Sequence, residues 1–287
     1  MSEDRVTGRL ALSRDFPLTA DLPMAGAGSR WLAGERWEPA SPRRASTVML
    51  VRDGDAGTEV FMLRRVAGMA FAPNMLVFPG GGCDVRDGDP DLPWAGPSPS
   101  EWANRLGCDV AEAQMYVAAA VREVFEETGV LLAGASADGV LADVSGTEWR
   151  EVRRGLVDRE LSLAGVLEDA GLVLRSDLLA AKAHWLTPEF EPRRFDTWFF
   201  AAVMPGHQEA DGDTSEADHS AWVRPSETIA AFGRGEAVML PPTLVCLEEV
   251  RDATSAEEFV RHTEHLPLIM PTIVSTPEGP AMRISVS

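Results

Sequence analysis

The 287-residue chain has few cysteines, few basic residues and no long apolar run. Its three cysteines, Cys83, Cys108 and Cys246, lie far apart and form no C-x-x-C pair, so the sequence indicates neither a disulfide framework nor a structural zinc site. No stretch approaches the ~18 consecutive apolar residues that a membrane-spanning helix needs. The first ten residues also lack the basic start and apolar run of a signal peptide. These absences predict a soluble, cytoplasmic protein in a reducing compartment.

The shortage of basic residues leaves 45 Asp and Glu against 26 Lys and Arg, a formal charge of −19. Nucleic acids and anionic membranes would repel such a chain, so neither is expected as a main partner. The negative field instead raises the local concentration of divalent cations. A hydrophobic content of 45 % is that of an ordinary globular protein. The length suits one large domain with extensions, or at most two small domains.

Strand and helix patterns alternate along the chain, which predicts an α/β or α+β fold. Two apolar runs within residues 45–66 flank the turn sequence DGDAG and predict a β-hairpin. A helix is predicted over residues 110–128, with Asp109 as its N-cap and Gly129 at its C-terminal end. Residues 1–44, rich in Pro, Gly and Arg, predict an irregular lead-in. Further strands are predicted within 183–187, 195–205 and 219–225, and further helices within 100–107, 148–171 and 226–250.

The sequence REVFEETGV, residues 122–130, places three glutamates on one face of the predicted helix. Glu123, Glu126 and Glu127 have the spacing i, i+3 and i+4, which makes their Cβ atoms neighbours ~5–6 Å apart. Arg122 can pair with Glu126, but one arginine cannot neutralise three carboxylates. A bound Mg²⁺ or Mn²⁺ can, because hard cations prefer carboxylate oxygens. The alternative is a solvated acidic face, although glutamates near a helix C-terminus oppose the helix dipole and are not favoured there by stability alone.

REVFEETGV matches the end of the Nudix box, G-x5-E-x7-R-E-U-x-E-E-x-G-U with U a bulky aliphatic residue, at every specified position. VFPGG, residues 77–81, is similar to the sequence that opens that box. The chain therefore resembles the Nudix hydrolase family. Its Arg122 comes 41 positions after Gly81, whereas the pattern places the arginine 14 positions after the glycine, an excess of 27. The resemblance thus implies an insertion inside the box.

Such an insertion is typical of one Nudix subgroup, which includes the peroxisomal coenzyme A diphosphatases of animals, and RRFDTWFF and MLPPT are similar to that subgroup as well. The resemblance implies a mixed β-sheet between helices. It implies a Nudix domain over residues 45–250 with a helical insertion at about 86–112, an N-terminal extension over 1–44 that packs on the main body, and a C-terminal extension over 251–287. The early glutamate of the box has no direct counterpart, and Asp84 and Asp87 are the alternatives. The terminal sequence ISVS is not a peroxisomal address.

The resemblance also implies roles for the residues of the box. Glu123 and Glu127 would be the main ligands of Mg²⁺ or Mn²⁺, with Glu126 as a further ligand. The carbonyl of Gly80 would complete the coordination, and Arg122 would hold the cluster in position. In such a site the ion neutralises the diphosphate and orients the attacking water, which accounts for most of the catalysis.

Other site residues are predicted outside the helix. The general base is either a box glutamate or a carboxylate of the acidic segment 209–222, where Glu216 is our choice against a plain solvated loop. Guanidinium groups hold phosphate in two places and aromatic rings stack on bases, although such residues also serve in ordinary ion pairs and in the core. The predicted substrate contacts are Arg65, Phe71, Gly81, Arg193, Arg194 and Phe195.

The sequence thus predicts an enzyme, a divalent-metal-dependent hydrolase of the diphosphate bond in a nucleoside diphosphate linked to a group X. Coenzyme A or its acyl esters, NADH and ADP-ribose remain open as the small-molecule substrate. The alternative is a Nudix-fold module that binds a nucleotide without cleaving it, but such modules usually lose box glutamates and all three are present here. A homodimer is common in the family and is a further expectation.

Overall fold

The computed structural model describes residues 13–19, 22, 24–66, 74–214, 217–262 and 266–285. The chain forms two compact units. The larger one contains residues 44–182 and 198–264, and the smaller one contains residues 1–43, 183–197 and 265–287. The predicted domain boundaries at 44/45 and 250/251 stay predictions.

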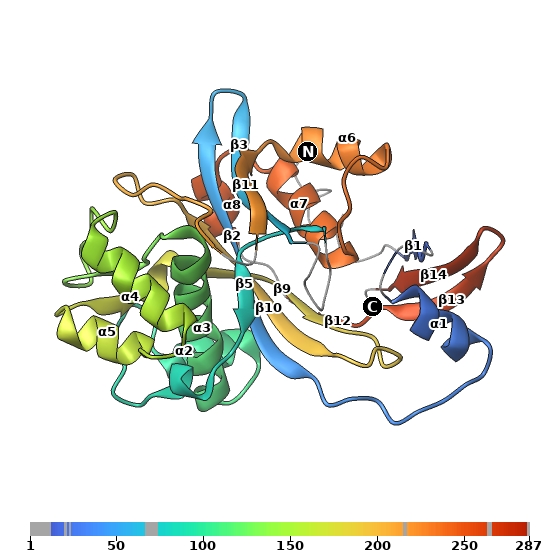
Figure 1. Cartoon of the computed structure of the whole chain (residues 1–287), viewed down its shortest axis with the longest axis horizontal. Helices are drawn as coiled ribbons and strands as arrows, with labels where there is room; N and C mark the ends of the chain where they lie inside the picture. Colours follow the sequence, from blue (N-terminus) through green and yellow to red (C-terminus); the bar gives the residue numbers. More distant parts are fainter. Residues whose placement is uncertain are drawn as a thin grey trace, which may run out of the picture. The chain divides into compact units, whose positions relative to one another are not determined.

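A mixed β-sheet forms the centre of the larger unit (Figure 1). Its hairpin consists of β2 (Arg43–Gly54) and β3 (Gly57–Arg65), which pair antiparallel as predicted. Residues 48–51 of β2 are fully buried, which places the core of this unit on the hairpin. The strand order is β11 (Ala217–Val223), β3, β2, β10 (Phe195–Val203) and β9 (Ala180–Leu186). Two short strands, β4 (Leu76–Val77) and β5 (Gly80–Gly82), pair with β3 and β2.

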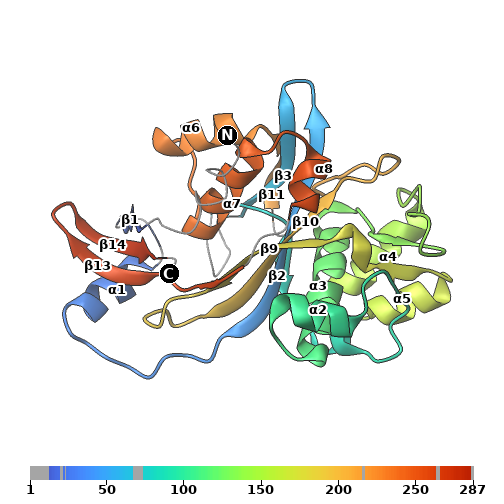
Figure 2. The ribbon, with the colours of Figure 1, turned by 180° about the vertical axis from the view of Figure 1, so that it is seen from behind.

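Helices cover both sides of this sheet, as expected for the predicted class (Figures 1 and 2). The helices α2 (Pro99–Leu106), α3 (Val110–Thr128), α4 (Thr147–Val157) and α5 (Leu163–Asp169) gather on one side. The helices α6 (Pro225–Gly233) and α7 (Pro241–Asp252) lie on the other, and α8 (Ala256–Arg261) follows. A small sheet contains β6 (Trp94–Ala95), β7 (Ala133–Gly134) and β8 (Val173–Arg175). The chain also forms two short 3-10 helices, η1 (Val85–Gly88) and η2 (Ser176–Leu178).

Helix α3 has the predicted bounds. The side chain of Asp109 accepts a hydrogen bond from the backbone N–H of Glu112 at 2.8 Å, and Gly129 ends the helix with φ +72°. Residues 117–121 are fully buried, so α3 is a core element and not a surface helix. Within the described residues, no helix is long and apolar enough to span a membrane. The three cysteines, all among the described residues, form no disulfide.

The smaller unit contains β1 (Arg14–Pro17), α1 (Ala25–Leu32), β12 (Leu268–Ile269), β13 (Thr272–Thr276) and β14 (Gly279–Ile284). Strands β1, β14 and β13 form an antiparallel sheet. The prediction that residues 1–44 are irregular is therefore wrong for β1 and α1. The glycines of α1 permit close packing: a Cβ added at Gly28 would lie 2.5 Å from Ile273 and 2.7 Å from Leu18. Tertiary packing thus outweighs the poor helix propensity of this stretch.

Glu191, in the turn between β9 and β10, is a buried carboxyl group whose Oε1 has no hydrogen-bond partner. Burial raises the pKa of Glu191 to about 7. The folded state therefore prefers the protonated acid. The stability that the protonated Glu191 contributes is lost as pH rises through about 7. We expect Glu191→Gln to raise the free energy of unfolding above pH 7 by about 1–3 kcal/mol, because glutamine cannot ionise and one unit of pKa corresponds to about 1.4 kcal/mol. Below pH 4.5 the two proteins should unfold alike. Urea unfolding at both pH values measures the difference, and an equal effect at both would contradict the assignment.

Candidate functional site

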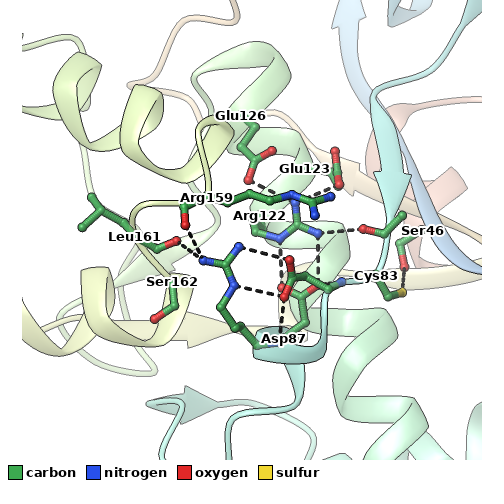
Figure 3. A network of polar contacts seen from close by, with 12 residues as sticks. Ser46, Cys83, Asp87, Arg122, Glu123, Glu126, Arg159, Leu161 and Ser162 are labelled. Atoms are coloured by element: carbon green, nitrogen blue, oxygen red, sulfur yellow. Dashed lines mark hydrogen bonds and ion pairs between the residues drawn. The ribbon is translucent and has the colours of Figure 1, made fainter.

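The last turns of α3 carry a compact charged cluster (Figure 3). Arg122 is buried and donates from Nη1 to the carboxylates of Glu123 at 2.8 Å and Glu126 at 3.0 Å. Its Nη2 also donates to the carbonyl oxygen of Gly82 in β5 at 2.9 Å. The guanidinium thus ties the helix to the glycine-rich strand, and the positioning role expected for Arg122 stays a prediction.

Asp87 is a further member of this cluster. Both of its carboxylate oxygens bind Arg122, Oδ1 to Nε at 2.9 Å and Oδ2 to Nη2 at 3.0 Å, and the residue is only 3 % exposed. Its Oδ2 also accepts from the backbone N–H of Asp84 at 2.7 Å, which fixes η1. Asp84 instead pairs with Arg86, which lowers the pKa of Asp84 to about 2.

The position of Asp87 decides between the two alternatives for the early acid of the box. Five residues, 82–86, separate Gly81 from Asp87, which therefore occupies the position of the first glutamate in the pattern. The insertion therefore follows Asp87 and contains β6 and α2. Trp102 of α2 is fully buried and packs edge-to-face on Phe200, 5.8 Å between ring centroids. The insertion is thus part of the core.

Glu123 is a buried member of the cluster. Its burial is the main reason that its pKa is raised to about 7, and Glu126 and Asp87 add to the rise while Arg122 opposes it. Arg122 remains charged, because Asp87, Glu123 and Glu126 raise the pKa of its guanidinium against the effect of burial. In the contacts described, the carboxylates of Asp87, Glu123 and Glu126 contact the guanidinium of Arg122, and Glu127 follows Glu126 on the same helix. If all three carboxylates that contact Arg122 ionise, this ion-pair group carries a surplus of negative charge.

Gly81 lies directly against Glu123. A Cβ added at Gly81 would stand 2.7 Å from the carboxylate, whereas one added at Gly82 meets nothing closer than a backbone oxygen at 3.9 Å. We expect Gly81→Ala to displace the Glu123 carboxylate and to lower kcat/KM by about 10²-fold, as ångström-scale displacement of a catalytic group does. Gly82→Ala is the matched control and should remain near wild type. Equal activity of the two variants would show that the approach of Gly81 has no consequence.

Glu127 contacts the same glycine-rich strand. Its Oε2 accepts a hydrogen bond from the backbone N–H of Gly80 at 2.7 Å, and the residue is 6 % exposed. Gly80 therefore lies beside the glutamates as predicted, through its N–H group. The coordinating role of its carbonyl oxygen stays a prediction.

The donors of the cluster suit a hard divalent cation, since they are carboxylate oxygens with surplus negative charge. Within the described part of the chain, no group of three or more His, Cys, Asp and Glu side chains is already arranged to hold a metal ion. Glu123 and Glu126 share Nη1 of Arg122, while Glu127 binds Gly80. Binding of an ion would require some of these carboxylates to exchange an N–H partner for the metal.

Cys83, just past the glycines, is not a nucleophile. Burial and the nearby Asp87 raise the pKa of its thiol to about 12, so it stays protonated near neutral pH. Its Sγ lies 4.0 Å from Oγ of Ser46, which donates to the carbonyl oxygen of Tyr116 at 2.7 Å. The hydrogen bond from Ser46 to Tyr116 joins β2 to α3.

The other predicted site residues are spread over the chain. Phe71 and Glu216 lie outside the described residues. Arg65 ends β3 and is partly buried. Arg193, Arg194 and Phe195 belong to the smaller unit. There the Arg194 guanidinium donates to the carbonyl oxygens of Thr187 at 3.0 Å and Ala40 at 3.1 Å, and substrate contacts for these residues stay predictions.

The comparisons with known proteins agree with this geometry. Residues 97–250, more than half of the chain, match the family model described as NUDT19 Nudix domain. The chain is 27 % identical to putative nudix hydrolase 7 of Caenorhabditis elegans over 203 residues, 70 % of this chain and 59 % of that protein. It is 24 % identical to the acyl-coenzyme A diphosphatase NUDT19 of Xenopus laevis over 221 residues, 64 % of this chain and 57 % of that protein.

A solved structure supports the same assignment. The NUDIX hydrolase from Alicyclobacillus acidocaldarius aligns with a TM-score of 0.66 at 25 % sequence identity, covering 79 % of this chain and 99 % of that chain. The alignments to the two curated relatives span less than two thirds of their lengths. The box residues on α3, the glycine-rich strand beside them and these similarities lead to one conclusion: the chain belongs to the Nudix hydrolases, a family of hydrolases that act on diphosphate bonds.

Proposed function

We propose that this chain hydrolyses the diphosphate bond of a nucleoside diphosphate linked to a group X, and that it needs Mg²⁺ or Mn²⁺ to do so. The surplus of buried carboxylates on α3 carries this proposal. Burying an uncompensated charge is costly, and a chain selected for stability alone would not gather three carboxylates around one guanidinium with Glu127 buried beside them in sequence. A bound divalent cation would offset this charge.

The residues of the cluster have distinct parts in the proposed site. Glu123, Glu126 and Glu127 would hold the ion. Once bound, it would neutralise the diphosphate and activate a water molecule. Asp87 binds one edge of the Arg122 guanidinium through both of its carboxylate oxygens, and Arg122 in turn would orient Glu123 and Glu126. The proton lost by the attacking water would pass to a carboxylate, either a box glutamate or Glu216.

Coenzyme A or an acyl-coenzyme A is the first substrate class to test, because the Xenopus laevis relative is named an acyl-coenzyme A diphosphatase. NADH and ADP-ribose contain the same diphosphate linkage and are the further candidates. The competing function is a module that binds a nucleotide without cleaving it. The presence of all three box glutamates favours catalysis. The cytoplasmic location and the homodimer expected from the sequence remain predictions.

Hydrolysis of a small substrate panel tests the proposed function. Coenzyme A, acetyl-coenzyme A, NADH, ADP-ribose and a nucleoside triphosphate would each be incubated with Mg²⁺, with Mn²⁺ and with EDTA, and the products separated by chromatography. We expect metal-dependent cleavage of at least one diphosphate. Cleavage that persists in EDTA would refute metal dependence. Tight binding of a nucleotide without cleavage of any compound would favour the binding module.

A further inference from the structure

Helix α4, which lies outside the Nudix box in sequence, carries a buried arginine next to the glutamate helix. Phe125 of α3 and Trp149 of α4 pack edge-to-face with ring centroids 5.9 Å apart. Arg153 follows Trp149 by one helical turn and so lies on the same face of α4. Its side chain is 9 % exposed. The aromatic contact therefore brings a guanidinium to the C-terminal end of α3.

Arg153 holds two different segments. Its Nε donates to the backbone carbonyl oxygen of Glu126 at 2.8 Å, one of the last four carbonyls of α3. Its Nη1 donates to Oδ1 of Asp211 at 2.7 Å. Nη2 is buried and has no hydrogen-bond partner. The last turn of α3 contains no basic residue of its own, so Arg153 supplies from α4 the positive charge that a helix C-terminus favours.

Asp211 is attached to the same end of the helix by its backbone. Its N–H donates to the carbonyl oxygen of Thr128 at 2.9 Å, and its Oδ1 also accepts from the N–H of Asp213 at 3.0 Å. Arg153 and Asp211 also pack closely on Gly129. A Cβ added there would lie 3.1 Å from Nη1 of Arg153 and 3.2 Å from Oδ2 of Asp211. The segment after β10 is thus fastened to the end of the helix that carries Glu126 and Glu127.

We propose that Arg153 is a positioning residue for the catalytic centre. By binding the Glu126 carbonyl and Asp211 together, it fixes the acidic segment 209–214 against the last turn of α3 and holds in place the turn that carries Glu126 and Glu127. This inference rests on the proposed function, because it assigns Arg153 a part in the same site. The planar guanidinium suits this arrangement, because its Nε and Nη1 donors point in fixed, different directions toward the two acceptors.

The electrostatics explain why the contact needs a cation. Asp211 brings a further carboxylate to a helix end that already carries Glu126, Glu127 and the negative pole of the dipole. Without Arg153 this carboxylate would be repelled and the segment would leave the helix. The buried Nη2 without a partner argues against a role in stability alone, since an unsatisfied buried donor destabilises the folded state.

The test compares Arg153→Met with Arg153→Lys and with Arg154→Met, a matched control at the neighbouring, exposed position of α4. Amide hydrogen exchange on the metal-free protein reports the segment directly. We expect Arg153→Met to lose protection at the amides of Asp211 and Asp213, and Arg154→Met to retain it. Titration calorimetry should show that Arg153→Met binds Mn²⁺ about 10- to 100-fold more weakly than the wild type, the usual effect of removing a group that orients metal ligands. Lysine should give intermediate values.

Kinetics and a double variant complete the test. With a substrate identified by the panel, kcat should fall about 10- to 100-fold in Arg153→Met with a smaller change in KM. Asp211→Asn should weaken Mn²⁺ binding in the same direction, and Arg153→Met combined with Asp211→Asn should be no worse than Arg153→Met alone, because the two residues act as one unit. The Asp211 side chain is 55 % exposed, so that variant is expected to fold.

The results separate the two proposals. If the wild type cleaves no substrate, the proposed function fails, while exchange and Mn²⁺ binding still decide the role of Arg153. Wild-type protection at Asp211 together with wild-type Mn²⁺ affinity in Arg153→Met would overturn the positioning role. An Arg153→Met protein that does not fold, with unchanged Mn²⁺ affinity in Arg153→Lys and Asp211→Asn, would show that Arg153 is structural only.

Discussion

Replacing Glu127 by glutamine is expected to lower kcat/KM by at least ~10²-fold while leaving the fold intact, because it removes one charge from the proposed metal site and almost no volume. Glutamine keeps an oxygen that can accept the hydrogen bond from the Gly80 N–H, which Glu127 accepts at 2.7 Å. The packing between α3 and the glycine-rich strand should therefore survive. The lower kcat/KM should come from the metal-dependent step, so Mg²⁺ and Mn²⁺ should activate Glu127→Gln less than the wild type in steady-state assays.

The matched control for Glu127→Gln is Glu148→Gln, the same substitution on the exposed first turn of α4. It changes the net charge by the same amount and should leave kcat/KM unchanged. Circular dichroism and thermal unfolding of both variants would confirm that the fold is retained. Near-normal activity of Glu127→Gln would remove Glu127 from the metal site.

Much of the site could be predicted from the sequence because its main part is local. The helix over residues 110–128 is defined by a capping aspartate, a terminating glycine and an apolar pattern, all of which act within a few residues. The spacing of Glu123, Glu126 and Glu127 then fixes their common face. The glycine-rich turn is recognisable by composition alone, and the structure places Gly80 and Gly81 beside these glutamates.

The rest of the site depends on contacts between distant segments. Asp87 binds Arg122 across 35 positions, and Arg153 reaches Asp211 across 58. Nothing in the local sequence around Arg153 distinguishes it from Arg154, although one is buried and the other exposed. A signal for Asp87 was present, because the box spacing counted forward from Gly81 leads to it. For Arg153 the only sequence signal is its helical spacing from Trp149, which has meaning only once α4 is known to pack on α3.

Arg122→Met is expected to lower the free energy of unfolding by about 3–5 kcal/mol, the cost of breaking a buried ion pair by removing one partner. The methionine fills a similar volume but leaves the buried carboxylates of Asp87 and Glu123 without their guanidinium. Against a typical total of ~5–15 kcal/mol for a domain, this is a large fraction. Urea unfolding in EDTA measures the loss. The control is Arg64→Met, which breaks an exposed ion pair between Arg64 Nε and Asp218 Oδ1, 2.7 Å apart. It should lower the free energy of unfolding by only ~0–1 kcal/mol.

The same variant separates the two roles of the acidic cluster, because a divalent cation can replace part of the missing positive charge. Ligand binding stabilises the folded state by ~2.7 kcal/mol when the ligand is present at 100 times its Kd. In the wild type, Mg²⁺ must compete with Arg122 for the Glu123 and Glu126 carboxylates. In Arg122→Met that competitor is gone, so Mg²⁺ should raise the unfolding midpoint by more than it does in the wild type, even though the ligands are less well oriented for catalysis. Equal midpoint shifts in both proteins would mean that Mg²⁺ binds away from the carboxylates that Arg122 holds.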